Sequence, residues 1–150
     1  MAPKFTLQNV LDVRHRKVEI RQIELSTLLV TRQETEKRLE SLKEFQRDLL
    51  EQLKDAQSGE IDLHQVGLLR MNIQQINSYI ESVSMELARL NNQIQEKKSE
   101  LIEAKQSEET LEVLKRKRHE IYVAEQVQIE TRMLDDIYIA RAFRNQQQGA

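Results

Sequence analysis

The chain of 150 residues contains no cysteine and no tryptophan, a single proline, three glycines and only 4% aromatic residues. Without cysteine there is no disulfide framework and no thiolate chemistry, which agrees with a cytosolic protein. So few prolines and glycines leave long stretches in which nothing interrupts a helix. The shortage of aromatic side chains, combined with 32% charged residues, argues against an ordinary globular core and is typical of long helices.

Long uncharged apolar runs are also missing. The sequence therefore predicts no transmembrane span, and its first residues lack the apolar segment of a signal peptide. We expect a soluble protein, or one that reaches a membrane only through its partners. The formal net charge of −2 gives no reason to expect an obligate nucleic-acid binder or a cationic membrane binder.

The sequence offers no constellation of residues suited to catalysis. Its histidines, His15, His64 and His119, are far apart and have no second ligand at metal-binding spacing, so we expect them at the surface. Three scattered glycines cannot build a phosphate-binding loop. We expect no enzyme activity, no bound metal and no cofactor.

Lys115-Arg116-Lys117-Arg118 is the one run of four adjacent cations. Such a run can contact nucleic acid, but no aromatic residues are interleaved with it to stack on bases. With a net charge close to zero, a solvated helix face or docking onto an acidic protein surface is the favoured interpretation.

Two stretches of heptad-spaced apolar residues dominate the chain. From residue 7 to residue 56, positions separated alternately by four and three residues are mostly apolar, and the same spacing runs from residue 66 to residue 94 without a miss. This 3.5-residue period is that of a coiled coil. The apolar members are Leu7, Leu11, Val18, Leu25, Leu28, Leu39, Leu42, Leu49, Leu53 and Ala56, then Val66, Leu69, Ile73, Ile76, Ile80, Val83, Leu87, Leu90 and Ile94.

One short break separates the two stretches. Gly59 suits the left-handed cap that ends a helix, and Asp62 with Gln65 reads as a capping box that opens the next one. The sequence thus predicts an all-α fold: a two-helix antiparallel coiled-coil hairpin with a longer, overhanging second helix. We expect one domain over residues 1–150, with helices at 5–57 and 63–145 and a turn at 58–62.

The two expected helices differ in length, at roughly 80 Å and 120 Å. If the chain turns near residue 60, Leu7 lies opposite a residue near 113, and about thirty residues of the second helix have no partner in the chain. This tail is rich in apolar residues, and an exposed apolar stripe usually marks a contact surface.

Polar residues interrupt the seams, and cations gather near the start of the chain. Counting from the turn places Arg14 roughly opposite Glu108, so these two residues could form a cross-helix ion pair, or their side chains could extend sideways into water. Arg14, Arg21 and the Lys115–Arg118 run make the open end of the hairpin basic.

Several motifs carry a resemblance to a known family. Phe5-x-Leu7 stands at the start, Leu39-x-x-Leu42-x-x-Phe45-Gln46 near the end of the first helix, and Ile73-x-x-Ile76-x-x-x-Ile80 after the short polar turn. This pattern resembles the flagellar export proteins of the FliJ family and the related type III secretion stalk proteins. The resemblance covers essentially the whole chain, including its length and the position of the turn.

The resemblance implies a non-catalytic cytoplasmic stalk component of the flagellar export apparatus, or of a related injectisome, at the inner membrane. FliJ-family proteins resemble the central stalk of rotary ATPases. They insert their paired ends into the hexameric export ATPase, FliI, contact the export gate protein FlhA, and are linked to export chaperones. On this pattern the gate contact falls on Arg38, Leu42, Phe45, Leu49 and Ile76, while Asn72, Tyr79 and Val83 depart from the family's choices. Leu42 and Leu49 are also seam positions, for which a plain core role is the alternative.

The basic end and the unpartnered tail are compatible with such a stalk. We therefore expect the ATPase to bind the segment from Leu7 to Arg21 and the tail from Leu111 to Phe143. The residues singled out for this contact are Leu7, Arg14, Arg21, Lys115, Arg118, Ile121, Met133, Ile137 and Phe143.

Three other interpretations are ranked below the export stalk. The first is a generic coiled-coil scaffold or tether that dimerises through its C-terminal helix. A prefoldin-type chaperone needs β-hairpins between its helices, and the break at 58–62 is too short to hold them. A nucleic-acid-binding arm would bind RNA with a salt dependence set by the Lys115–Arg118 run.

Overall fold

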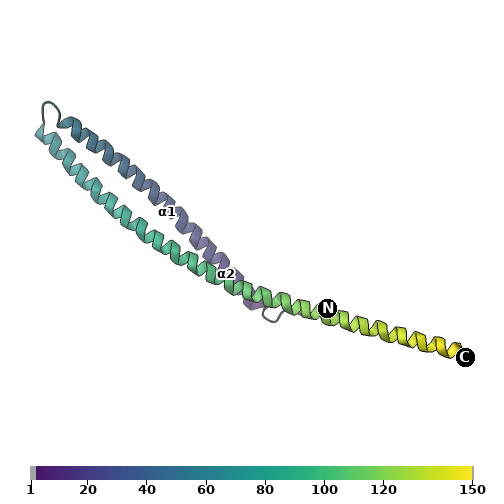
Figure 1. The fold of residues 1–150 in the computed structure, drawn as a ribbon. Coiled ribbons are helices and arrows are strands. Elements are labelled where there is room, and N and C mark those ends of the chain that lie inside the picture. Colours follow the sequence, from purple (N-terminus) through teal and green to yellow (C-terminus); the bar gives the residue numbers. More distant parts are fainter. Residues whose placement is uncertain (1–2, 150) are drawn as a thin grey trace. The chain divides into compact units, whose positions relative to one another are not determined.

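The computed structural model describes residues 3–149 and contains two helices, α1 (Gln8–Ala56) and α2 (Leu63–Gln148), joined by a short loop (Figure 1). The two helices pack against each other and the second is the longer, which confirms the predicted all-α fold. The chain divides into two compact units, Val18–Glu103 and Met1–Lys17 with Ala104–Ala150.

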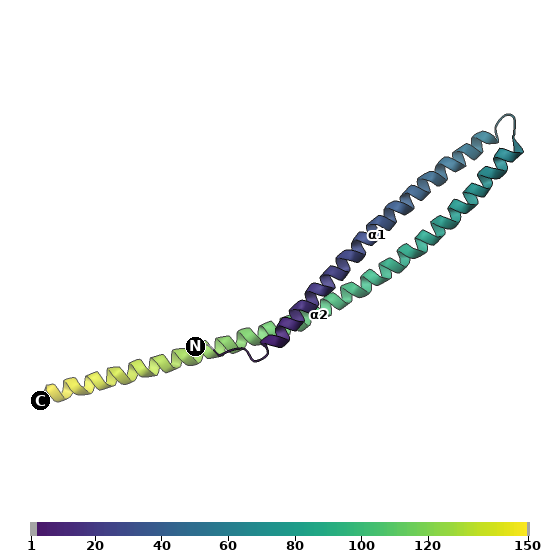
Figure 2. The same cartoon turned by 180° about the vertical axis from the view of Figure 1, so that it is seen from behind.

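Within the unit Val18–Glu103 the helices run antiparallel, as both ribbon views show (Figures 1 and 2). Partners on α2 lie progressively earlier in the chain as α1 advances, which is the pairing expected of a hairpin. The cross-helix pairs are Arg21 with Glu100, Arg32 with Asn91, Arg38 with Glu86, and Gln46 with Asn77.

The predicted seam is the core of the protein. All fifteen positions from residue 7 to residue 56, and all nine from residue 66 to residue 94, are buried or half-buried. Ile94 is completely buried, and Leu49, Leu69 and Ile76 form a buried cluster near the loop. Because each buried aliphatic side chain contributes about 1.5–3 kcal/mol, this seam supplies most of the stability of the helix pair.

Thr35 is the one buried polar residue among residues 3–149, at 4% exposure. Its hydroxyl donates to the backbone carbonyl of Thr31 at 2.8 Å, four residues earlier. A threonine is therefore tolerated in the seam because its own helix satisfies the hydroxyl.

The loop between the helices follows the predicted chemistry with one difference. Gly59 has a φ of 87°, in the left-handed region that favours glycine. Ser58 supports the end of α1 by donating its hydroxyl to the carbonyl of Asp55 at 2.9 Å. Asp62 caps α2 by accepting the N–H of His64 at 3.0 Å, the second residue of the helix, whereas a capping box would use the third.

The observed helix ends differ from the expected ones by three residues at each end of the chain. α1 begins at Gln8, not near Phe5, because residues 5–7 form a turn in which the Gln8 N–H donates to the Phe5 carbonyl at 3.1 Å. Arg118 holds this turn: its guanidinium donates to Thr6 Oγ1 at 3.1 Å and lies 5.5 Å from the centre of the Phe5 ring. At the other end α2 continues past 145 to Gln148.

The last part of α2, drawn in yellow-green and yellow in Figures 1 and 2, is open to solvent. Every described residue from 123 to 149 is exposed. We call residues 123–149 the tail. Over residues 3–149, no helical stretch combines the length and apolarity that a membrane span requires.

Candidate functional site

A cleft lies where the residues before α1 meet α2, within the unit Met1–Lys17 with Ala104–Ala150. We call it the terminal cleft; its volume is about 600 Å³. Its lining combines an apolar part with cations and one carboxylate. The lining residues are Pro3, Lys4, Phe5, Thr6, Leu11, Glu112, Lys115, Arg116, Arg118, His119 and Tyr122.

Two residues predicted to bind the ATPase hold this cleft together. Arg118 makes the contacts to Thr6 and Phe5 described above, and Lys115 Nζ donates to Gln8 Oε1 at 2.7 Å. Both cations therefore bond to neutral oxygens. Within the described residues neither forms an ion pair, so their positive charge is not compensated inside the chain.

Leu7 and Arg14, also predicted for this end, are half-buried in the same unit. Arg14 Nη1 donates to the backbone carbonyl of Ser107 at 2.8 Å, and the Glu108 carboxylate lies 2.7 Å from His15 Nδ1. The count from the turn therefore placed Arg14 beside the correct stretch of α2. The guanidinium bonds to the residue before Glu108, and the carboxylate pairs with the histidine that follows Arg14.

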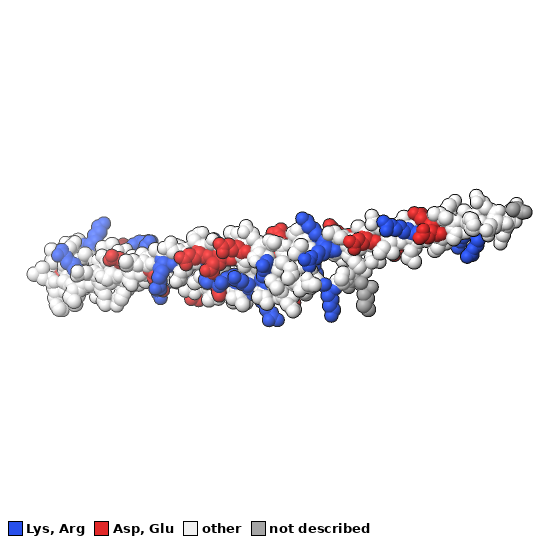
Figure 3. All heavy atoms as spheres, turned by 90° about the horizontal axis from the view of Figure 1, so that it is seen from below, with Lys and Arg blue, Asp and Glu red and all other residues white. Residues whose placement is uncertain are grey.

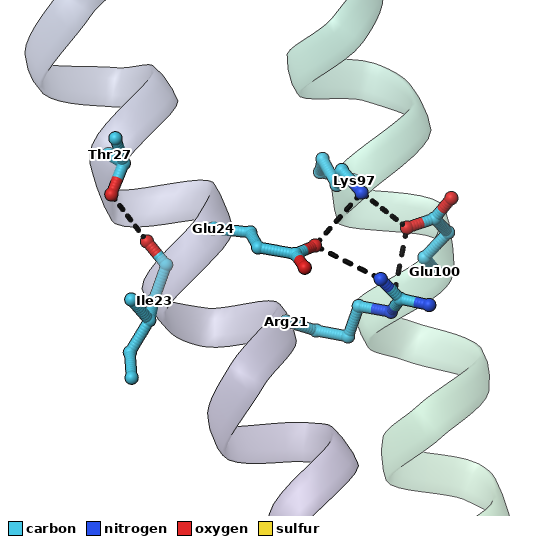
Figure 4. A network of polar contacts seen from close by, with 6 residues as sticks. All are labelled: Arg21, Ile23, Glu24, Thr27, Lys97 and Glu100. Carbon is cyan, nitrogen blue, oxygen red and sulfur yellow. Dashed lines mark hydrogen bonds and ion pairs between the residues drawn. The ribbon is translucent and has the colours of Figure 1, made fainter.

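Arg21 belongs to the other unit, where it joins an ion-pair network between α1 and α2 (Figure 4). Its Nη1 lies 3.0 Å from Glu24, and Lys97 Nζ lies 2.9 Å from Glu24 and 3.1 Å from Glu100. Hydrogen bonds from Lys97 and then Arg21 hold the pKa of Glu24 below its ordinary value. The same carboxylate, followed by that of Glu100, raises the pKa of Lys97. Arg21 is thus engaged with residues of its own chain.

The remaining residues predicted for the ATPase contact lie on or next to the tail. They are open to solvent, with Ile121 59%, Met133 59%, Ile137 49% and Phe143 60% exposed. Removing apolar side chains of this size from water is favourable in free energy, so this end of α2 presents apolar area that a partner could cover.

The stripe expected to contact the export gate divides into a buried and an exposed part. Leu49 and Ile76 belong to the buried cluster near the loop, and Leu42 packs against that cluster. Phe45 is 53% exposed, and Arg38 is exposed with its guanidinium 2.6 Å from the Glu86 carboxylate. Only Arg38 and Phe45 therefore present a side chain that a partner could reach fully.

Tyr79 extends the exposed part of this stripe. It precedes Glu86 by one heptad, as Phe45 follows Arg38 by one heptad, so in an antiparallel pair both aromatic residues lie on the edge marked by the Arg38–Glu86 pair. Tyr79 is 51% exposed. The two rings, on different helices, thus form one aromatic edge.

The contacts of individual cations differ between the two units. In the unit Val18–Glu103, the cations Arg21, Arg38 and Lys97 all pair with glutamates, whereas Lys115 and Arg118 of the terminal cleft bond to neutral groups. On the face shown in Figure 3, red and blue side chains are interspersed with white ones, and this also holds for the stretch of α2 toward its C-terminal end at the right. No three His, Asp or Glu side chains among residues 3–149 lie close enough together to hold a metal ion.

Sequence reasoning missed part of the cleft. Lys4, His119 and Tyr122 line it but were not among the expected site residues. The sequence features that pointed to this part of the chain were the Lys115–Arg118 run and the Phe5-x-Leu7 motif. They did not predict that the residues before α1 turn back onto α2, because this turn depends on the contacts of Arg118 with Thr6 and Phe5.

These features define an all-α coiled-coil hairpin protein whose second helix carries an exposed apolar end next to a basic cleft. A comparison with protein families matches residues 3–148 to the flagellar FliJ protein. The chain therefore belongs to the flagellar FliJ family, whose membership makes it a component of the flagellar export apparatus. No curated protein and no solved structure matched the chain.

Proposed function

We propose that this chain is a cytoplasmic stalk of the export apparatus that inserts its terminal end into the hexameric, FliI-like export ATPase and promotes assembly of the hexamer. The observation that carries the proposal is the tail, whose apolar side chains are exposed from residue 123 onward next to the basic terminal cleft. Family membership supplies the apparatus in which such a partner is found.

The arrangement of apolar residues around the tail favours a partner that surrounds it. Val123, Val127 and Leu134 follow one another at steps of four and seven, which places them on one face of the helix. Ile129 comes two residues after Val127, and side chains two positions apart in a helix point in directions that differ by about 200°. Met133 follows Ile129 by four, so it shares that second face.

A scaffold that dimerises through this segment would bury mainly one stripe, as coiled-coil seams do. A helix that is apolar on more than one face is suited to burial on several sides. The centre of a ring provides this environment, so the two-faced tail supports the stalk over the dimeric tether.

For the export gate we propose a contact on the exposed edge formed by Arg38, Phe45 and Tyr79. Aromatic and arginine side chains are the residue types that most often anchor interfaces. Leu49 and Ile76 contribute by holding the helices together beneath this edge, since both are buried in the chain's own core. Export chaperones are further partners of the proposed stalk.

Substitution of tail residues tests the ATPase contact without removing a helix. The variant Val127→Gln/Met133→Gln/Ile137→Gln changes exposed residues only, so the hairpin should keep its stability. If the tail enters the hexamer, stimulation of ATPase activity and of hexamer assembly should fall at least tenfold, as expected when several apolar side chains lose their burial.

The matched control is Met71→Gln/Met85→Gln/Ile102→Gln, which replaces three similarly exposed apolar residues outside the tail. Unchanged stimulation by the tail variant, or an equal loss in the control, contradicts the proposal. A stable dimer in sedimentation without any ATPase, abolished by the tail substitutions, would favour the scaffold in its place.

A further inference from the structure

We infer that the terminal cleft binds an acidic segment of a partner protein, one that places a carboxylate next to an apolar side chain. The inference rests on the proposed function in taking this partner to be a protein of the export apparatus. It goes further in assigning the cleft as a separate recognition site with a defined ligand chemistry, distinct from burial of the tail.

The charges of the cleft are the first observation. Four cations and one carboxylate line it, and the two cations with assigned hydrogen bonds donate to neutral oxygens. In the other unit Arg21, Arg38 and Lys97 each pair with a glutamate, so the charge of these three cations is compensated there. Uncompensated cations grouped around a concave surface attract an anionic ligand.

The apolar part of the cleft is the second observation. Phe5, Leu11 and Tyr122 contribute to the lining, with Leu11 buried and Phe5 and Tyr122 half-buried. The Arg118 guanidinium lies over the face of the Phe5 ring and donates to Thr6 Oγ1, and these two contacts hold one wall of the cleft in place. A ligand that fills this space needs an apolar group as well as a carboxylate.

Protein is favoured over nucleic acid by the same geometry. One aromatic wall is occupied by the Arg118 guanidinium, so the Phe5 ring is not open on that side for a stacked base. The Glu112 carboxylate would also face a phosphate backbone. An acidic peptide can present a single carboxylate to Lys4 and Arg116, which line the cleft, whereas a nucleic acid carries a charge at every phosphate.

The test measures binding of defined polymers to the full-length chain. The probe is a copolymer of glutamate and tyrosine, compared with polyglutamate and with polyuridylate. We expect the copolymer to bind more tightly than polyglutamate, and amide NMR shifts to gather at residues 4–8 and 112–122. The variant Lys4→Gln/Arg116→Gln should weaken copolymer binding about tenfold, because each exposed ion pair is worth roughly a factor of two to five.

Lys4 and Arg116 are chosen because both are exposed and no described contact of the fold depends on them. The matched control is Arg70→Gln/Arg89→Gln, which removes two exposed cations from the other unit. The control should bind the copolymer as the unaltered chain does. Higher salt should weaken binding, since exposed charges are screened.

Three results would overturn the inference: tighter binding of polyuridylate than of the copolymer, shifts located away from the cleft, or an equal loss in the control. None of these measurements involves the ATPase. Failure here therefore leaves the tail experiment standing, and a cleft that binds the copolymer while the tail variant still stimulates the ATPase would refute the proposed insertion alone.

Discussion

Ile94 provides the sharpest test of how the helix pair is stabilised. It is the fully buried large side chain of the seam, whereas Ile102, eight residues later on the same helix, is 57% exposed. Replacing each by alanine removes the same atoms from the same helix. Only their environment differs, so the pair of variants separates burial from helix propensity.

The expected cost at Ile94 follows from the atoms removed. Ile94→Ala takes away three carbon atoms, worth about 0.8 kcal/mol each when buried, and leaves a cavity that raises the cost. The better helix propensity of alanine returns about 0.4 kcal/mol. We expect a loss of about 2–4 kcal/mol in the free energy of unfolding at Ile94, and a change of less than about 0.5 kcal/mol at Ile102.

Urea unfolding of the full-length variants, followed by circular dichroism, measures both values. Ile94→Ala should lower the midpoint of the transition without changing its slope. Equal midpoints for the two variants would refute the assignment of Ile94 to the core. A loss confined to the Ile102 variant would mean that the register between the helices is displaced.

Three further predictions follow from individual residues. Thr35→Val should raise the free energy of unfolding by about 0.5–1.5 kcal/mol in the same urea assay, because it removes a buried hydroxyl and keeps the shape of the side chain. Gly59→Ala should lower the free energy of unfolding by about 1 kcal/mol, because Gly59 has a positive φ. Gly67→Ala should raise it by about as much, because Gly67 lies inside α2 with open space around a new Cβ. Equal effects of the two substitutions would contradict the loop geometry. The ion pair of Glu24 with Lys97 should stabilise the helix pair only between an acid and an alkaline limit. Because the pKa of Glu24 is lowered, the stability that its carboxylate contributes is lost as the pH falls through the folded value, below 4.5. Because the pKa of Lys97 is raised, the stability that its ammonium contributes is lost as the pH rises past 10.5. Hydrogen exchange at residues 21–28, compared with Glu24→Gln, would show no such window if the network were absent in solution.

The fold could be predicted because its core is a periodic pattern. A 3.5-residue spacing identifies the buried face of each helix whatever the residue at a given position, so even Arg14 and Gln46 are half-buried where the pattern puts them. The position of the loop could be predicted from Gly59, because residues other than glycine rarely adopt the positive φ that ends the helix there.

The binding surfaces were predicted less completely. Leu49 and Ile76 satisfied both the seam pattern and the family's contact pattern, and the structure places them in the core. Periodicity is a property of one helix, whereas the terminal cleft depends on contacts between residues more than a hundred positions apart. The Arg118–Phe5 contact is of this kind, and no local spacing in the sequence predicts it.

The exposed tail has a consequence for the lifetime of the protein. An unpacked helix opens readily, since little tertiary contact opposes local unfolding, and an opened helix is a substrate for proteases. Arg132, Arg141 and Arg144 would offer trypsin its cleavage sites there, while the seam protects α1. A partner that covers the tail would also shield it from degradation. The amount of intact chain would then follow the amount of partner, and copies without one would be removed.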